Sequence, residues 1–166
     1  MRLRLLIITS LVFALPIMLP QPTFAQVPYS PTGCEYTVQF PGQPELKNLY
    51  TPDTGSYQNA SYYGSNYFIR SECFPLTGPV DAETAYSITA KYLEANGLQN
   101  TNYEFNDDHL GYHIKARGNK TIGETYGTFV IAAYFGERSL MVLFVGSTSS
   151  VYPTDEIFSF LNSCTR

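Results

Sequence analysis

LMVLFVG (Leu140–Gly146) and, shortly before it, ETYGTFVIAAYF (Glu124–Phe135) are the two stretches that decide the fold class. A strand with one face in water alternates apolar and polar residues, whereas these stretches carry apolar residues at both odd and even positions. Strands of that kind lie in the interior of a sheet that is covered on both sides. The sequence therefore predicts a sheet with other elements packed on both of its faces.

The rest of the chain supplies the elements that such a sheet needs. Asp81 is a suitable N-cap and Gly97 a suitable end for a mid-chain helix, and a second helix is predicted from Thr154 to about Cys164. Short turns between successive strands indicate antiparallel pairing. Strands are predicted at Cys34–Phe40, Tyr57–Tyr63, Tyr67–Phe74, Asn102–Asn106, Leu110–Arg117, Gly123–Phe135 and Ser139–Gly146. The predicted class is α+β: a mainly antiparallel sheet of six to seven strands with a mid-chain and a C-terminal helix packed on it.

Residues 1–25 are predicted to be a cleaved signal peptide. Arg2 and Arg4 precede an apolar run over Leu5–Leu19, and Ala25 offers a small residue at the cleavage position. An uncleaved anchor is the rival interpretation, but the run is shorter than the roughly 20 residues of a membrane-spanning helix. We expect an exported protein, periplasmic or extracellular, with an extended leader at 26–33 and a single α+β domain at 34–166.

The charge balance argues against two classes of partner. Without Arg2 and Arg4, the chain keeps eight basic and 14 acidic residues, a formal charge of −6. An acidic protein does not bind nucleic acid or anionic membranes non-specifically. A small basic cluster, Lys115, Arg117 and Lys120, is interpreted as a solvated strand edge and turn. No second apolar run of spanning length follows residue 25, so no membrane span is expected after cleavage.

The three cysteines, Cys34, Cys73 and Cys164, allow one disulfide and leave one thiol. An exported protein meets an oxidising compartment, and all three residues are expected to face the core. Cys34–Cys73 is the preferred pairing because two cysteines at strand ends can meet with ordinary geometry. Pairing of Cys34 with Cys164 remains open. The third cysteine is predicted to be an inert buried thiol, and the alternative is an assembly factor whose free thiol pairs with a partner.

Two short motifs carry a resemblance to a known fold group. The first strand ends in FPGQP (Phe40–Pro44), and the C-terminal helix contains FLNS (Phe160–Ser163). With the Tyr-rich strands, the mid-chain helix and the run of hairpins between them, the chain resembles the Mog1/PsbP-like group. The resemblance implies an α+β sandwich used as a scaffold for protein contacts. It implies no particular activity, because the motifs consist of turn and core residues.

No catalytic residue, cofactor or metal site is predicted from known motifs, since the sequence lacks the common nucleophile, zinc and nucleotide-binding patterns. One stretch leaves an alternative open: Asp107, Asp108, His109 and His113 can be interpreted as the site of a metal-dependent or hydrolytic enzyme. On one strand the two histidines would lie about 13 Å apart, too far to bind one ion without further ligands. The preferred interpretation is two turn aspartates and two histidines on a polar strand face.

Fourteen tyrosines and no tryptophan favour a binding role. Tyr57, Tyr62, Tyr63 and Tyr67 surround one predicted hairpin, and tyrosine combines an apolar ring with a polar tip that suits contact surfaces. These four residues are the candidate contact patch, and the alternative is that they pack within the sheet and core, because tyrosine also suits strands. The function predicted from the sequence is that of a non-catalytic binding or accessory protein of the cell envelope, acting on an envelope protein or a small ligand.

Overall fold

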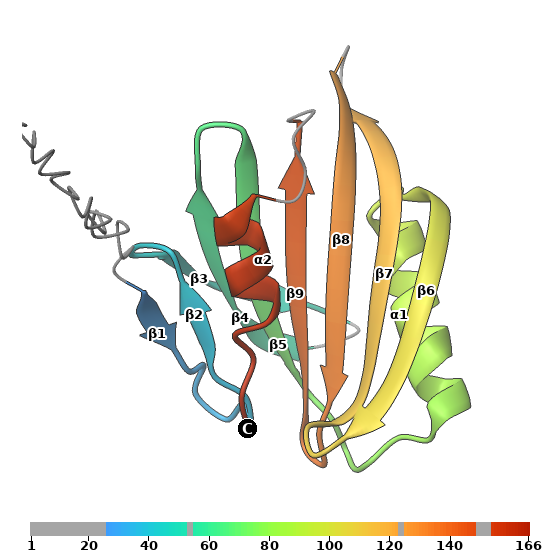
Figure 1. Cartoon of the computed structure of the whole chain (residues 1–166). Helices are drawn as coiled ribbons and strands as arrows, with labels where there is room; N and C mark the ends of the chain where they lie inside the picture. The colour runs from blue at the N-terminus through green and yellow to red at the C-terminus, as the bar shows by residue number, and fades with distance from the viewer. Residues whose placement is uncertain (1–25, 53–54, 123–124, 149–153) are drawn as a thin grey trace, which may run out of the picture.

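The computed structural model describes residues 26–52, 55–122, 125–148 and 154–166, so the predicted signal peptide lies outside the described residues. Its centre is an antiparallel sheet of seven strands (Figure 1). In spatial order these are β3 (Glu45–Thr51), β4 (Gly55–Tyr63), β5 (Tyr67–Pro75), β9 (Ser139–Ser147), β8 (Thr125–Phe135), β7 (Gly111–Ile122) and β6 (Gln99–Asp108). The predicted α+β class is confirmed.

Strand β9 lies in the middle of this sheet, and all nine of its residues are buried. Its odd-numbered residues, such as Met141 and Leu143, belong to one core cluster, and its even-numbered residues, such as Val142 and Phe144, belong to a second. The expectation from LMVLFVG therefore holds, because a strand that is apolar on both sides needs a cover on each face.

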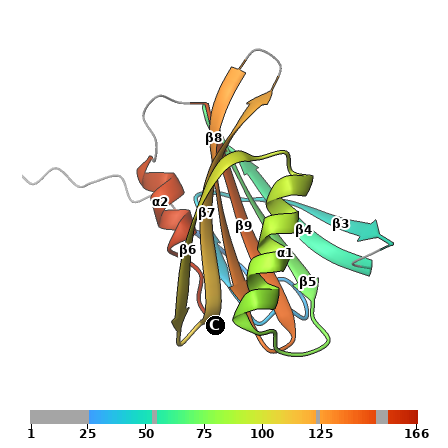
Figure 2. The same ribbon diagram turned by 90° about the vertical axis from the view of Figure 1, so that its right-hand side faces the viewer.

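Helix α1 (Ala82–Ala95) covers the face that carries Val142 and Phe144 (Figure 2). The helix begins at Asp81, whose carboxylate accepts a hydrogen bond of 2.7 Å from the backbone N–H of Thr84. Ala85, Thr89 and Leu93 form its buried side. Gly97, with φ of 68°, follows its C-terminus in the left-handed conformation that commonly ends a helix.

The opposite face is covered by two elements that lie side by side in Figure 1. One is helix α2 (Asp155–Leu161), capped at Thr154; the other is a ribbon of two antiparallel strands, β1 (Val27–Tyr29) and β2 (Val38–Phe40). The rings of Phe40 and Phe160 join them, with centroids 5.0 Å apart. No helix within the described ranges is long and apolar enough to cross a membrane.

One expected strand is misplaced, and two strands were not expected. The first predicted strand, Cys34–Phe40, is not part of the main sheet: only Val38–Phe40 is a strand, and it pairs with β1 above the sheet. Its place in the sheet is taken by β3, which was not predicted because most of its residues are exposed and show no alternation of buried and exposed positions. The predicted leader at 26–33 also contains a strand, since Val27–Tyr29 forms β1 and pairs with β2.

The ribbon is joined covalently to the main sheet. Cys34, just before β2, forms a disulfide with Cys73 of β5, with the two Cα atoms 6.1 Å apart. This is the pairing preferred from the sequence. Cys164 is free and buried, and burial raises the pKa of its thiol to about 12. That thiol stays protonated and enclosed at neutral pH, so it is not placed to pair with a partner.

Glu35 is a second link between the ribbon and the sheet. One carboxylate oxygen accepts hydrogen bonds from the backbone N–H groups of Arg138 and Ser139, at 2.7 and 2.9 Å, and the other accepts one from Arg166 at 2.8 Å. Burial alone would raise the pKa of Glu35, but these hydrogen bonds outweigh it and lower the pKa to about 2. The carboxylate therefore ties the ribbon to the β8–β9 turn and to the C-terminus.

We expect removal of the disulfide to lower the free energy of unfolding by roughly 3–4 kcal/mol, because the bond closes a long loop in the unfolded chain. Urea unfolding of the double variant Cys34→Ala/Cys73→Ala against the parent measures this loss. A reductant should destabilise the parent to a similar extent and leave the double variant unchanged. A parent whose unfolding curve does not respond to reductant would contradict the assignment.

Glu35 also predicts how stability depends on pH. Its pKa is about 2 in the folded chain against 4.5 ordinarily, so its contribution is complete above about pH 4.5 and is lost as the pH falls toward 2. The variant Glu35→Gln should be less stable than the parent at pH 7 and should lose less stability over that interval. Urea midpoints measured at several pH values test this, and parallel curves for the two proteins would refute it.

Candidate functional site

A hollow of about 460 Å³ lies between α2 and strands β6 and β7. Its apolar lining includes Val130 of β8 and Leu161 of α2, and Phe158, with 62% of its surface exposed, stands at the rim. The polar lining consists of Asn102, Glu104, Lys115, Arg117 and Asn162. We call this hollow the α2 groove.

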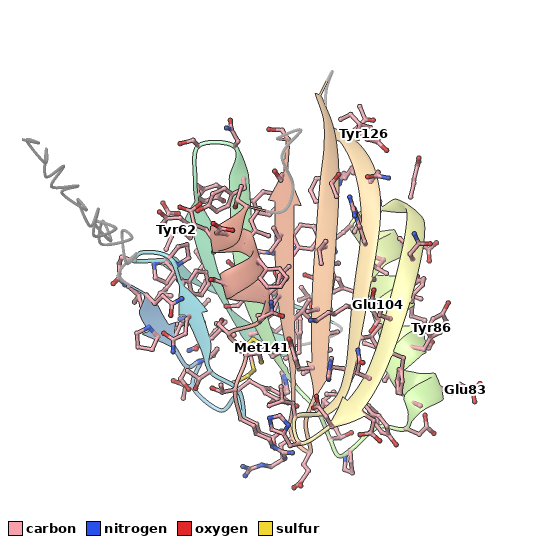
Figure 3. All side chains as sticks on the ribbon, viewed as in Figure 1. Tyr62, Glu83, Tyr86, Glu104, Tyr126 and Met141 are labelled. Atoms are coloured by element: carbon pink, nitrogen blue, oxygen red, sulfur yellow. A yellow bond between two sulfur atoms is a disulfide. The ribbon has the colours of Figure 1, made fainter. Side chains whose placement is uncertain are left out.

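The register of two strands places the polar side chains together. Asn102 of β6 lies opposite Arg117 of β7, and Glu104 lies opposite Lys115. Because side chains alternate along a strand, all four are on the same side of the sheet as Val130, which is opposite Arg117 on the next strand. Neither α2 nor the ribbon extends over β6 and β7 on this side (Figure 1). In Figure 3, Glu104 lies at this end of the sheet and Tyr62 at the other.

Helix α2 is linked to the groove wall by Asn162, its C-cap. Lys115 donates a hydrogen bond of 3.3 Å from Nζ to the side-chain oxygen of Asn162, and the Asn162 amide donates in turn to the backbone carbonyl of Phe158. The groove thus combines cations, amides and one carboxylate beside an apolar floor. Such a surface can hold an extended chain with both apolar and charged side chains, and it has no group set up as a nucleophile with a base.

The structure does not bring the four tyrosines of the candidate contact patch together. Tyr62 and Tyr67 lie on the α2 side, packed against the core there with ring centroids 6.5 Å apart. Tyr57 and Tyr63 lie on the α1 side, since residues of opposite parity point to opposite faces. Whether either pair contacts a partner stays a prediction, but one patch of four tyrosines is excluded by the sheet between them.

The stretch behind the enzyme alternative is the β6–β7 hairpin. Asp107 and Asp108 end β6, and His109 lies in the turn with 84% of its side chain exposed. Asp108 accepts a hydrogen bond of 2.8 Å from the backbone N–H of Leu110, which is the role expected of a turn aspartate. Among the residues that the structure describes, no three His, Cys, Asp or Glu side chains are placed to hold a metal ion.

His113 differs from the expectation of a polar strand face. It is buried, its ring stacks on Tyr134 with centroids 5.3 Å apart, and its Nδ1 atom has no hydrogen-bond partner. Asp108 is the nearest acidic group, with an oxygen 3.7 Å from Nδ1. The prediction was wrong because the burial of His113 depends on residues distant in sequence: its ring lies on Tyr134 of β8, which in turn contacts Tyr36 of the segment before β2.

A buried polar cluster lies under α1, away from the groove. Glu72 of β5 accepts hydrogen bonds from Asn59, at 2.9 Å, and from the hydroxyl of Tyr92, while Arg70 donates to Tyr92 and to Asn96. Burial, followed by the charge of Glu72, raises the pKa of Tyr92, which keeps the hydroxyl as a donor. The cluster fastens α1 to β4 and β5, and we assign it a structural role.

The comparisons with known proteins do not identify this chain. No protein-family model matches it, and no curated protein matches its sequence.

Sequence reasoning missed the groove, although it noticed some of its residues. The sequence interpretation makes Lys115 and Arg117 a solvated strand edge, places Asn162 in the FLNS motif without a binding role, and gives no role to Glu104 or Phe158. The alternation of Lys115 and Arg117 on one face was a usable signal. Their apolar neighbours come from β8 and α2, and only the strand register and the position of the helix bring them together.

The position of His113 generates a prediction that separates a packing role from a metal site. We expect His113→Phe to keep or raise the free energy of unfolding, by up to about 1 kcal/mol, because it removes a buried nitrogen without a partner and keeps the ring on Tyr134. Urea unfolding with and without added Zn²⁺ measures this. A clear loss of stability in the variant, or stabilisation by Zn²⁺ in the parent alone, would contradict it.

Proposed function

We propose that this protein is an exported, non-catalytic binding protein of the cell envelope and that its site is the α2 groove. The partner is an extended segment of another protein that carries an apolar side chain and carboxylates on alternate residues. One observation carries the proposal: a pair of cations lies next to an apolar floor on a part of the sheet that neither α2 nor the ribbon covers.

The charge distribution supports a carboxylate-bearing partner. The whole chain has a formal charge of −4, yet the groove holds two cations, Lys115 and Arg117, against one carboxylate, Glu104. The two cations are two positions apart on one strand, which corresponds to roughly 7 Å. Carboxylates on alternate residues of an extended segment have the same spacing, so both can be met at once. Arginine and lysine pair with carboxylates through charge-assisted hydrogen bonds.

The apolar lining and the amides support a polypeptide partner. Phe158 is an exposed apolar side chain of the groove, and Val130 and Leu161 offer a surface beside it where an apolar side chain of a partner can be buried. Asn102 and Asn162 carry both donors and acceptors, which suits the alternating N–H and C=O groups of an extended backbone.

Export is supported by the signal-like N-terminal sequence and by the Cys34–Cys73 disulfide, since disulfides persist in oxidising compartments. We also propose that the fold is a Mog1/PsbP-like sandwich. The support is a seven-stranded antiparallel sheet with a mid-chain helix and a C-terminal helix, an arrangement that is compatible with that group.

A phage-displayed library of random heptapeptides, selected on the immobilised protein, tests the groove. We expect enrichment of peptides with carboxylates two residues apart beside a large apolar residue. For a synthetic selected peptide, Lys115→Ala and Arg117→Ala should each raise the dissociation constant about tenfold or more, because each removes one partner of a charge pair. Phe158→Ala should weaken binding similarly, and raised salt should weaken it further.

Matched controls lie elsewhere on the surface. Lys91→Ala removes an exposed lysine of α1, and Phe105→Ala removes a partly exposed ring of β6 from the other side of the sheet. Both should leave the affinity unchanged. Selected peptides without carboxylates, or peptides that bind the groove variants as tightly as the parent, would overturn the proposal.

A further inference from the structure

The outer side of strand β3 has no neighbouring strand among the residues that the structure describes. The first six of its seven residues are exposed, and β3 projects with the end of β4 beyond α1 (Figure 2). A long exposed edge strand presents backbone donors and acceptors on which another strand can pair. This edge is at the end of the sheet opposite the α2 groove.

Two exposed apolar side chains of β3 lie at equal distances from its middle residue, Asn48. Leu46 and Tyr50, two positions to either side, are 61% and 72% exposed. Both point to the α2 side of the sheet, because Leu46 lies opposite Ala60, a residue of the core on that side, and Tyr50 shares its parity. Two large apolar side chains are thus held in water at equal distances from one residue.

We propose that the protein forms a homodimer in which β3 pairs antiparallel with β3 of a second copy, about a two-fold axis at Asn48. This register places Leu46 directly opposite Tyr50 of the second copy, and the symmetry repeats the pair on the other side of the axis. Only in this register does each of the seven residues of β3 lie opposite a β3 residue of the second copy. The two sheets become one continuous sheet.

The charges of β3 favour the same axis. A two-fold axis at Glu45 or at Lys47 would set that charge against its own copy, which is destabilising. An axis at Asn48 sets a neutral amide against itself and places Lys47 opposite Leu49 of the second copy. Lys47 is also 3.9 Å from the carboxylate of Glu45, which offsets its charge, and its aliphatic part can cover the leucine.

The other edge of the sheet shows the features that prevent pairing. Strand β6 carries Glu104, Asp107 and Asp108, and its register is broken by a bulge between Gln99 and Asn102. Charged side chains and bulges are common protections of an edge. Strand β3 has no bulge, and its two charged residues, Glu45 and Lys47, pair with each other. It is therefore the edge at which a second copy pairs.

Sedimentation equilibrium of the oxidised protein over a range of concentrations tests the dimer, with two double variants of matched size. Leu46→Lys/Tyr50→Lys places like charges opposite each other across the axis, and we expect the mass of a single chain. Leu46→Glu/Tyr50→Lys places opposite charges in the same positions, and we expect the dimer to be retained. Phe105→Glu, at the β6 edge, should also leave the dimer intact. Circular dichroism verifies that each variant is folded.

Cysteine variants read the register directly. Asn48→Cys lies on the axis and should form a disulfide-linked dimer on mild oxidation, whereas Lys47→Cys lies diagonally from its copy and should link far less. Buried Cys164 serves as the internal background in every sample. A parent that stays monomeric at all concentrations, a dimer that both double variants retain or lose alike, or equal linking through positions 47 and 48 would overturn the proposal.

Discussion

Strand β9 has no face in contact with solvent, and all nine of its residues are buried. Burying a large aliphatic or aromatic side chain contributes roughly 1.5–3 kcal/mol, so this strand and its neighbour β8 hold a large part of the stabilising surface. A sheet with such a centre cannot stand with one bare face. Burial of both faces of β9 therefore requires helix α1 on one side and α2 with the β1–β2 ribbon on the other. The links that hold the ribbon in place help to keep the second of these faces buried. The disulfide fixes Cys34 to β5, and Glu35 binds the β8–β9 turn.

The parts of the fold that could be predicted are those in which a short segment contains its own evidence. LMVLFVG is apolar throughout, Asp81 and Thr154 are capping residues, and Cys73 follows a strand pattern. The parts that could not be predicted depend on neighbours distant in sequence. Val38 and Phe40 show that one side of β2 is apolar, but not which sheet receives it. Strand β3 has no buried side, so its pairing with β4 leaves no trace in its own residues.

The groove was hidden from the sequence for a related reason. The sequence correctly predicts that Lys115 and Arg117 are surface residues. They become part of a candidate binding site only because β8 and α2 place an apolar floor next to them. The opposite error occurred at His113, which reads as a polar strand residue and is buried on Tyr134. In both cases the deciding fact is which element covers which strand. The four tyrosines of the candidate patch show the same dependence on the sheet. They are close in sequence around one hairpin, but the alternation of side chains along a strand places two of them on each face.

The covers of β9 leave the two ends of the sheet with different properties. Toward β6 and β7, the sheet keeps a polar face beside α2, and its edge is protected by charge and a bulge. Toward β3, the first six residues of the edge strand are exposed and the edge has no neighbouring strand among the described residues. A dimer through β3 would therefore leave both grooves accessible, one at each end of a sheet whose strands are spaced by about 4.8 Å, so that the grooves would be roughly 60 Å apart. At that distance one short peptide cannot reach both grooves, but a long or repetitive partner protein could, and its second contact would form at the effective concentration set by the first.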